Sequence, residues 1–229
     1  NWVFTVQRDI RQVKTFPIVH YVPTDGSLRP QLEEVKLALP GDEHIETLRL
    51  ITIHIETGRL QAVDYPHIQP IPSGAGFFTN CRSWWGTDSR HIYFVDVERG
   101  YKKARVIESQ ADTGITRVLF EETSDTQINL SQHYDERPTF MPLPESNEVL
   151  WFSERSGWAH LYLYDLKTGQ LKHPVTRGDW LVRSILAFDA SRREVFVQTA
   201  GRGINSDGSD PDPGRDPYYR DIARINVDT

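Results

Sequence analysis

The residue patterns that could support catalysis are few. Serine hydrolases present their nucleophile on a tight turn between a strand and a helix, most often written Gly-x-Ser-x-Gly. The nearest match is Gly203-Ile204-Asn205-Ser206-Asp207-Gly208, whose first spacing is longer by one residue and which has no strand-to-helix context. The sequence therefore predicts no catalytic residue in this chain.

Metal and cofactor sites are equally unsupported. An Asp-rich segment could offer oxygen ligands to calcium, but it lacks the first Asp and the last Glu of the helix-loop-helix pattern. Its acidic and amide residues are Asn205, Asp207, Asp210 and Asp212, which we interpret as a solvated surface loop within the irregular stretch Gly201–Asp216. Zinc is disfavoured because the eight His are scattered and Cys81 is the only cysteine. We expect no metal and no cofactor.

Two pairs of adjacent carboxylates stand out, Glu33-Glu34 and Glu121-Glu122. Neighbouring residues in a strand face opposite sides, so neither pair can easily act on one substrate atom. We expect each pair to place one Glu at the rim of the core and one in solvent. Asn129-Leu130-Ser131 is a formal glycosylation acceptor of a kind that arises by chance.

Composition narrows the class of protein. The chain has 229 residues, with 26 Lys and Arg against 32 Asp and Glu, for a formal charge of -6. This balance argues against nucleic acid as a partner. No apolar stretch approaches the length of a membrane span, and a single cysteine excludes a disulfide scaffold without indicating a compartment. Without a signal or tail, the chain is interpreted as a piece of a larger protein.

The elements that would position any site are predicted to be strands. Short β-branched and aromatic runs alternate with Gly, Pro, Asp and Asn, and no helical periodicity is convincing. The runs are Leu48–Ile55, His91–Val97, Thr116–Phe120, Glu148–Phe152, His160–Tyr164, Glu194–Thr199 and Asp221–Val227. The fold class is all-β.

Two markers repeat along the chain. Thr-Gly turns follow strands at Thr57, Thr113 and Thr168, which are 56 and then 55 residues apart, and Thr229 occupies the same place 61 residues later. Between them, a polar turn precedes a β run three times, at Thr87–Arg90, Pro144–Asn147 and Asp189–Arg192. Repeats of this length and order are typical of four-stranded antiparallel propeller blades. A β-sandwich is the structural alternative, because it too has regularly spaced strands.

We therefore predict one partial β-propeller domain over 1–229, with about three to four blades. Residues 1–47 would be the remainder of an earlier blade and a long connection, and residues 48–229 the repeating blades. The run Trp151–Asp165 predicts a β-hairpin with its turn at Arg155–Gly157, aromatic side chains packed between blades and charges at the turn.

Four blocks of this sequence resemble the N-terminal propeller region of dipeptidyl peptidase IV-like serine peptidases, in the prolyl oligopeptidase superfamily. They are Arg29–Glu33 with Leu39–Gly41, Glu122–Thr126, Trp151–Asp165 and Asp216–Arg220. The block Trp151–Asp165 is the most specific, whereas Ile128 stands near the place where the second block of the family usually has Trp.

The resemblance implies a parent enzyme with a C-terminal α/β-hydrolase domain as the partner of this propeller and with peptides as substrates. Such enzymes remove dipeptides from peptide N-termini by a Ser-Asp-His mechanism. The propeller would restrict access to the active site and scaffold it. The family anchors the substrate amine through a Glu pair that it carries earlier in the chain. Because their surroundings match other blocks, we transfer this role to neither Glu33-Glu34 nor Glu121-Glu122, and we expect the fragment to be inert as a peptidase.

Two rivals remain open. One is a free-standing propeller that binds other proteins and has no enzymatic partner domain. The other is a different member of the superfamily, an oligopeptidase or acylaminoacyl peptidase. A partial propeller would also leave the apolar faces of its terminal blades uncovered, which predicts self-association of the chain.

Overall fold

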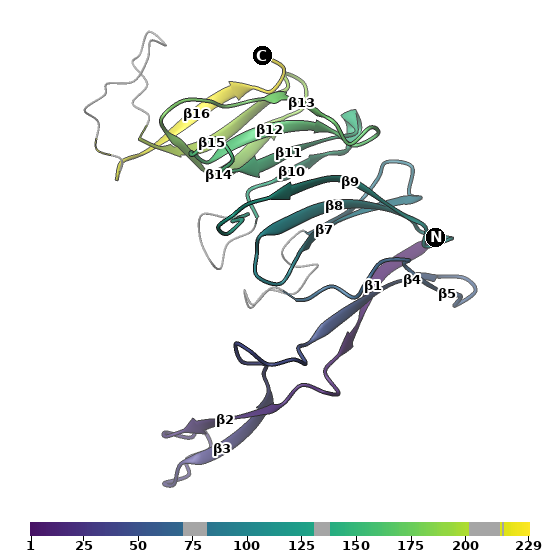
Figure 1. Cartoon of the computed structure of the whole chain (residues 1–229), viewed down its shortest axis with the longest axis vertical. Helices are drawn as coiled ribbons and strands as arrows, with labels where there is room; N and C mark the ends of the chain where they lie inside the picture. Colours follow the sequence, from purple (N-terminus) through teal and green to yellow (C-terminus); the bar gives the residue numbers. More distant parts are fainter. Residues whose placement is uncertain (71–81, 131–137, 202–215, 217) are drawn as a thin grey trace. The chain divides into compact units, whose positions relative to one another are not determined.

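The computed structural model describes residues 1–70, 82–130, 138–201, 216 and 218–229, and their regular structure is almost entirely strand (Figure 1). One 3₁₀ turn, Pro144–Ser146, is the exception among these residues. The strands are β1 (Trp2–Asp9), β2 (Thr15–His20), β3 (Gln31–Lys36), β4 (Thr47–His54), β5 (Leu60–Ala62), β6 (Ser83–Trp85), β7 (His91–Val97), β8 (Lys103–Gln110), β9 (Thr116–Thr123), β10 (Met141–Leu143), β11 (Glu148–Ser153), β12 (His160–Asp165), β13 (Leu171–Pro174), β14 (Leu181–Asp189), β15 (Glu194–Ala200) and β16 (Arg220–Asn226). The all-β prediction is confirmed.

The chain forms two compact units, of which the first contains residues 1–70 and 111–114. Its sheet has the order β1-β4-β5, and β1 pairs with β4 from Trp2 opposite His54 to Asp9 opposite Thr47. The segment before residue 48 therefore gives a strand to the same sheet as the first predicted run. Between β1 and β4 the chain forms the separate β2–β3 hairpin, in which Thr15 lies opposite Lys36 and His20 opposite Gln31.

The second unit holds the repeats. Two sheets have four antiparallel strands, in the orders β6-β7-β8-β9 and β10-β11-β12-β13, and a third has the order β14-β15-β16. Figure 1 shows the β10–β13 sheet between the other two. Sequential strands pair with their neighbours throughout, as expected for meandering blades.

The middle sheet is buried on both faces at its central strands, because β11 and β12 each carry a continuous run of apolar residues. Along β11, Val149 and Trp151 pack toward the β6–β9 sheet, while Leu150 and Phe152 pack toward the β14–β16 sheet. Since alternate residues of a strand face opposite sides, the continuous apolar run of β11 fills two different cores. This arrangement explains why the run is not alternating in hydrophobicity.

The polar turns repeat in backbone detail as well as in sequence. Asn147 and Arg193, which stand immediately before β11 and β15, adopt left-handed backbone with φ of 54° and 52°. Each accepts the same backbone bond, from Leu166 N–H to the Asn147 carbonyl and from Val227 N–H to the Arg193 carbonyl, both at 2.9 Å. These equivalences identify the sheets as structural repeats.

The Thr-Gly turns also fit between neighbouring sheets. Gly169 has φ of 74°, and a Cβ built there would lie 2.0 Å from the carbonyl oxygen of Leu119 in β9. Only glycine permits this approach and this backbone conformation together. The glycine of the third turn is therefore required by the packing of the β10–β13 sheet on β9.

Candidate functional site: polar joints between neighbouring sheets

The structure describes no residues for the weak serine-hydrolase match Gly203–Gly208 or for the Asp-rich loop of Asn205, Asp207, Asp210 and Asp212, which lie outside the described ranges. Cys81 also lies outside them. Within the described part of the chain, no cluster of three or more His, Cys, Asp or Glu residues could hold a metal ion. No described helix is long and apolar enough to cross a membrane.

The two carboxylate pairs behave differently. Glu33 and Glu34 are both exposed on β3, and Glu33 Oε2 lies 2.7 Å from His20 Nε2 across the hairpin. The expectation of one rim residue and one solvent residue is therefore wrong for this pair, because the β2–β3 hairpin has no core beneath it. It is correct for the second pair, in which Glu121 is exposed and the side chain of Glu122 is 10% exposed.

Glu122 joins two sheets. It lies near the end of β9, and its carboxylate accepts hydrogen bonds from three groups of the next sheet. The donors are Trp151 Nε1 at 2.6 Å, Ser153 Oγ at 2.5 Å and Arg155 Nη2 at 2.7 Å. Hydrogen bonds to a charged acceptor are stronger than those between neutral groups, so one carboxylate ties β9 to β11 and the turn that follows. We call these four residues the Glu122 joint.

The guanidinium of Arg155 completes the Glu122 joint. It lies over the ring of Tyr162, 4.5 Å from the ring centroid, and donates to the Tyr164 hydroxyl at 2.7 Å. Burial alone would lower the pKa of Arg155, but the bonds to Tyr164 and Glu122 outweigh it and raise the pKa. The predicted hairpin between β11 and β12 is confirmed, and its turn is closed by the bond from Gly157 N–H to the Glu154 carbonyl at 2.9 Å.

His160 is a core residue rather than a catalytic base. It is 2% exposed, its Nε2 lies 2.9 Å from the carbonyl of Gly178, and its Nδ1 lies 2.9 Å from Thr176 Oγ1. Burial lowers its pKa, partly opposed by the Gly178 carbonyl. A neutral ring that donates from Nε2 and accepts at Nδ1 satisfies both contacts. His160 therefore fixes the loop between β13 and β14.

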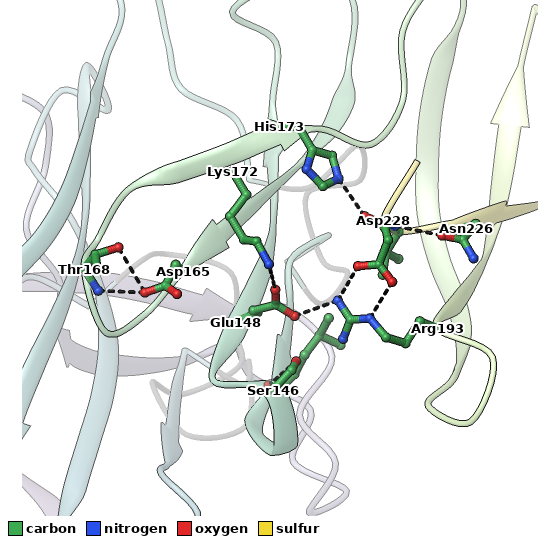
Figure 2. A network of polar contacts seen from close by, with 11 residues as sticks. Ser146, Glu148, Asp165, Thr168, Lys172, His173, Arg193, Asn226 and Asp228 are labelled. Atoms are coloured by element: carbon green, nitrogen blue, oxygen red, sulfur yellow. Dashed lines mark hydrogen bonds and ion pairs between the residues drawn. The ribbon is translucent and has the colours of Figure 1, made fainter.

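A second joint connects the β10–β13 sheet to the β14–β16 sheet (Figure 2). Glu148, whose side chain is 4% exposed, contacts Lys172 Nζ at 2.5 Å and Arg193 Nη2 at 2.8 Å. Arg193 also pairs with Asp228, at 2.7 Å from Nε and 2.8 Å from Nη2. We call these four residues the Glu148 joint.

The hydrogen bonds of the Glu148 joint together outweigh the burial of its central carboxylate. Burial alone raises the pKa of Glu148, but hydrogen bonds from Lys172, Ser146 and Arg193 hold it below its ordinary value. The hydrogen bond from Arg193 likewise lowers the pKa of Asp228. Both carboxylates are thus kept charged, and the guanidinium of Arg193 pairs with both of them.

Sequence reasoning did not find either joint. The Glu122 joint could have been found, since it brings together the two most distinctive blocks, Glu122–Thr126 and Trp151–Asp165. The Glu148 joint had a weaker signal, because only the position of Arg193 in the repeated polar turn marks it. In both joints the ionised groups pair with one another instead of facing a reacting atom. Their geometry holds sheets in place and contains no paired nucleophile and base.

Repeated four-stranded antiparallel sheets, stacked through apolar faces and locked at their edges by ion pairs, define a segment of a β-propeller. The comparisons with known proteins agree. The family model for the dipeptidyl peptidase IV N-terminal region matches residues 1–212, and the chain belongs to this family. The predicted resemblance and the predicted partial propeller are confirmed.

The similar proteins are dipeptidyl peptidases. The chain is 50% identical over 58 residues to a probable dipeptidyl peptidase 4 of Aspergillus flavus, covering 24% of the chain and 7% of that protein. It is 25% identical over 191 residues to one of Neosartorya fischeri, covering 80% of the chain and 24% of that protein. The crystal structure of Porphyromonas gingivalis dipeptidyl peptidase 4 has a TM-score of 0.69 at 17% identity, over 91% of the chain and 28% of that structure. The chain thus spans about a quarter of these longer relatives.

Proposed function

We propose that this chain is the noncatalytic propeller segment of a serine-type dipeptidyl peptidase. It restricts the access of peptides to the active site of a C-terminal α/β-hydrolase domain and scaffolds that site. The observation that carries the proposal is the family match over residues 1–212, together with the convergence of the two most distinctive sequence blocks at the Glu122 joint.

A gate of this kind must be rigid enough to exclude large substrates. Two features of the β10–β13 sheet support rigidity. It is covered on both faces by apolar clusters, and it is tied at its edges to both neighbours by ion pairs with almost fully buried carboxylates. Ion pairs of this geometry fix relative position more than they add stability. Peptides that are small or unstructured would pass, whereas folded proteins would not.

The first test compares this chain with the full-length protein that contains it, using Gly-Pro and Ala-Pro chromogenic anilides. We expect release of the chromophore by the full-length protein and none by this chain. Cleavage by neither would favour a propeller that serves only to bind other proteins, and cleavage by the chain itself would place a nucleophile within it.

The gate itself is tested in the full-length protein by substrate size. Glu122→Gln should loosen the joint, and so increase cleavage of a folded protein that begins with Gly-Pro, relative to cleavage of the Gly-Pro anilide. Glu121→Gln is the matched control, because its carboxylate is exposed and lies outside the joint. If the two variants change the ratio equally, the sheet joint does not contribute to gating.

A further inference from the structure

Two buried N–H donors lie without acceptors at one edge of the β6–β9 sheet. They are Arg82 Nε and Trp84 Nε1, and neither has a hydrogen-bond partner in the structure. Native proteins satisfy nearly all buried polar groups, so two orphaned donors two residues apart call for an explanation. Among the strands that the structure describes, β6 is the edge strand of its sheet, because the strand order begins with it.

The two side chains face the same way. Trp84 lies opposite Tyr93 in the register of β6 and β7, and the bond from Val95 N–H to the Arg82 carbonyl, at 2.9 Å, continues this pairing by two residues. Residues two apart on a strand share a face. Trp84 stacks on Tyr93 with ring centroids 5.5 Å apart. Trp84 thus packs at the rim of the core that joins the β6–β9 and β10–β13 sheets, and the same alternation places Arg82, opposite Val95, on that face.

Arg82 is a partly buried cation that forms no ion pair among the described residues. Burial lowers its pKa to about 10, against smaller opposing effects of Tyr101 and Asp96. Asp96 is paired with Arg105 at 3.5 Å. Tyr101 lies in the turn between β7 and β8, where it adopts left-handed backbone with φ of 57° beside Gly100. The guanidinium of Arg82 therefore lacks an anion that would offset the free-energy cost of its desolvation.

We propose that Arg82 and Trp84 form a binding site for a carboxylate of a peptide. A carboxylate offers two coplanar oxygens, which match the forked donors of a guanidinium and can also accept from an indole N–H. Its negative charge would repay the burial of Arg82. The edge of β6 that pairs with no other described strand could bind an extended peptide backbone beside the site. The choice of a peptide as the source of the carboxylate rests on the proposed function. The observation that the two donors lack an acceptor is independent of it.

The test is a calorimetric titration of this chain, without any peptidase domain, with each of three tetrapeptides. They are Gly-Pro-Gly-Gly with a free C-terminus, its C-terminal amide, and amidated Gly-Pro-Gly-Glu, whose only carboxylate is in the side chain. We expect saturable binding of the first, at least tenfold weaker binding of the amide, and recovery by the third only if side-chain carboxylates are also accepted. Equal binding of the acid and the amide, or binding of none of the three, would overturn the proposal.

Variants separate a binding site from a structural arginine. Arg82→Met should abolish the preference for the free acid and raise Tm by about 2–4 °C, because it removes an unpaired buried cation. Arg105→Met, which breaks ion pairs with Asp96 and Glu121, should lower Tm and leave binding unchanged. Trp84→Phe keeps an aromatic ring at this position and should only weaken binding. A fall in Tm for Arg82→Met like that of Arg105→Met would show a structural role and overturn the proposal. A negative titration would leave the anilide and substrate-size tests of the proposed function untouched.

Discussion

Removing the carboxylate of Glu122 should cost far more stability than removing the carboxylate beside it. In Glu122→Ala, the indole N–H of Trp151 and the hydroxyl of Ser153 both lose an acceptor, and these residues are 0% and 1% exposed. Each buried donor left unsatisfied costs about 1–3 kcal/mol. Arg155 adds less, because its side chain is 32% exposed and water can replace the lost pair. The expected loss is about 3–5 kcal/mol, the range found when one member of a buried ion pair is removed.

The adjacent residue supplies the control. Glu121 pairs with Arg105 at 2.7 Å and with Lys103 at 3.4 Å, but its side chain is 37% exposed, so Glu121→Ala should cost less than about 1 kcal/mol. Both variants would be measured at pH 7 by urea unfolding, followed through tryptophan fluorescence. A loss for Glu122→Ala no larger than that for Glu121→Ala would refute the reasoning, because it would mean that the donors of the joint find other acceptors.

Three further predictions concern pH, a glycine and association. Because the folded-state pKa of Glu148 is lowered, the unfolded chain binds more protons than the folded chain just below pH 4.5, the ordinary pKa of the group. The free energy of unfolding of the wild type should therefore exceed that of Glu148→Gln by its full amount above that pH, and the difference should disappear as pH falls through the folded-state pKa. Urea unfolding at a series of pH values checks this, and a constant difference would contradict it. Gly169→Ala should lower Tm much more than Gly58→Ala in thermal unfolding. Both glycines have positive φ, but an added Cβ would collide with the Leu119 carbonyl only at position 169, so equal losses would exclude the steric effect. The β14–β16 sheet has exposed apolar side chains, such as Ile222 at 67% exposure, which predict that the chain associates with itself as its concentration rises. Light scattering at micromolar concentration checks this, and finding only monomer would disprove it.

Several strands that bury an apolar face were predicted from the sequence, although β8, which buries Ala104, Val106 and Ile107, was not. His91–Val97 was predicted with the bounds of β7, and Glu148–Phe152 and His160–Tyr164 each differ from the observed strand by one residue. Their β-branched and aromatic runs reflect burial directly. The β2–β3 hairpin was missed although β2 carries Phe16, Ile18 and Val19, because these side chains are exposed and do not form a buried face. Its pairing depends on backbone bonds, which leave little trace in residue type.

The joints between sheets show why a site is harder to predict than a fold. Trp151 and Glu122 are 29 residues apart in sequence, and nothing local indicates that the indole of one donates to the carboxylate of the other. The continuous apolar run of β11 indicates that both of its faces are buried, but the partner across each core depends on how the sheets stack. Polar groups near a buried edge must find partners, and the sequence alone does not say which.

The same requirement gives meaning to the groups that have no partner. Glu122 and Glu148 are nearly buried, and each is surrounded by donors from the neighbouring sheet, so their cost of burial is offset within the chain. Arg82 is a charged group in a comparable position without such compensation. Burial of an arginine without a partner anion gains nothing in stability. The cost of Arg82 is therefore best explained by a ligand that supplies the missing anion.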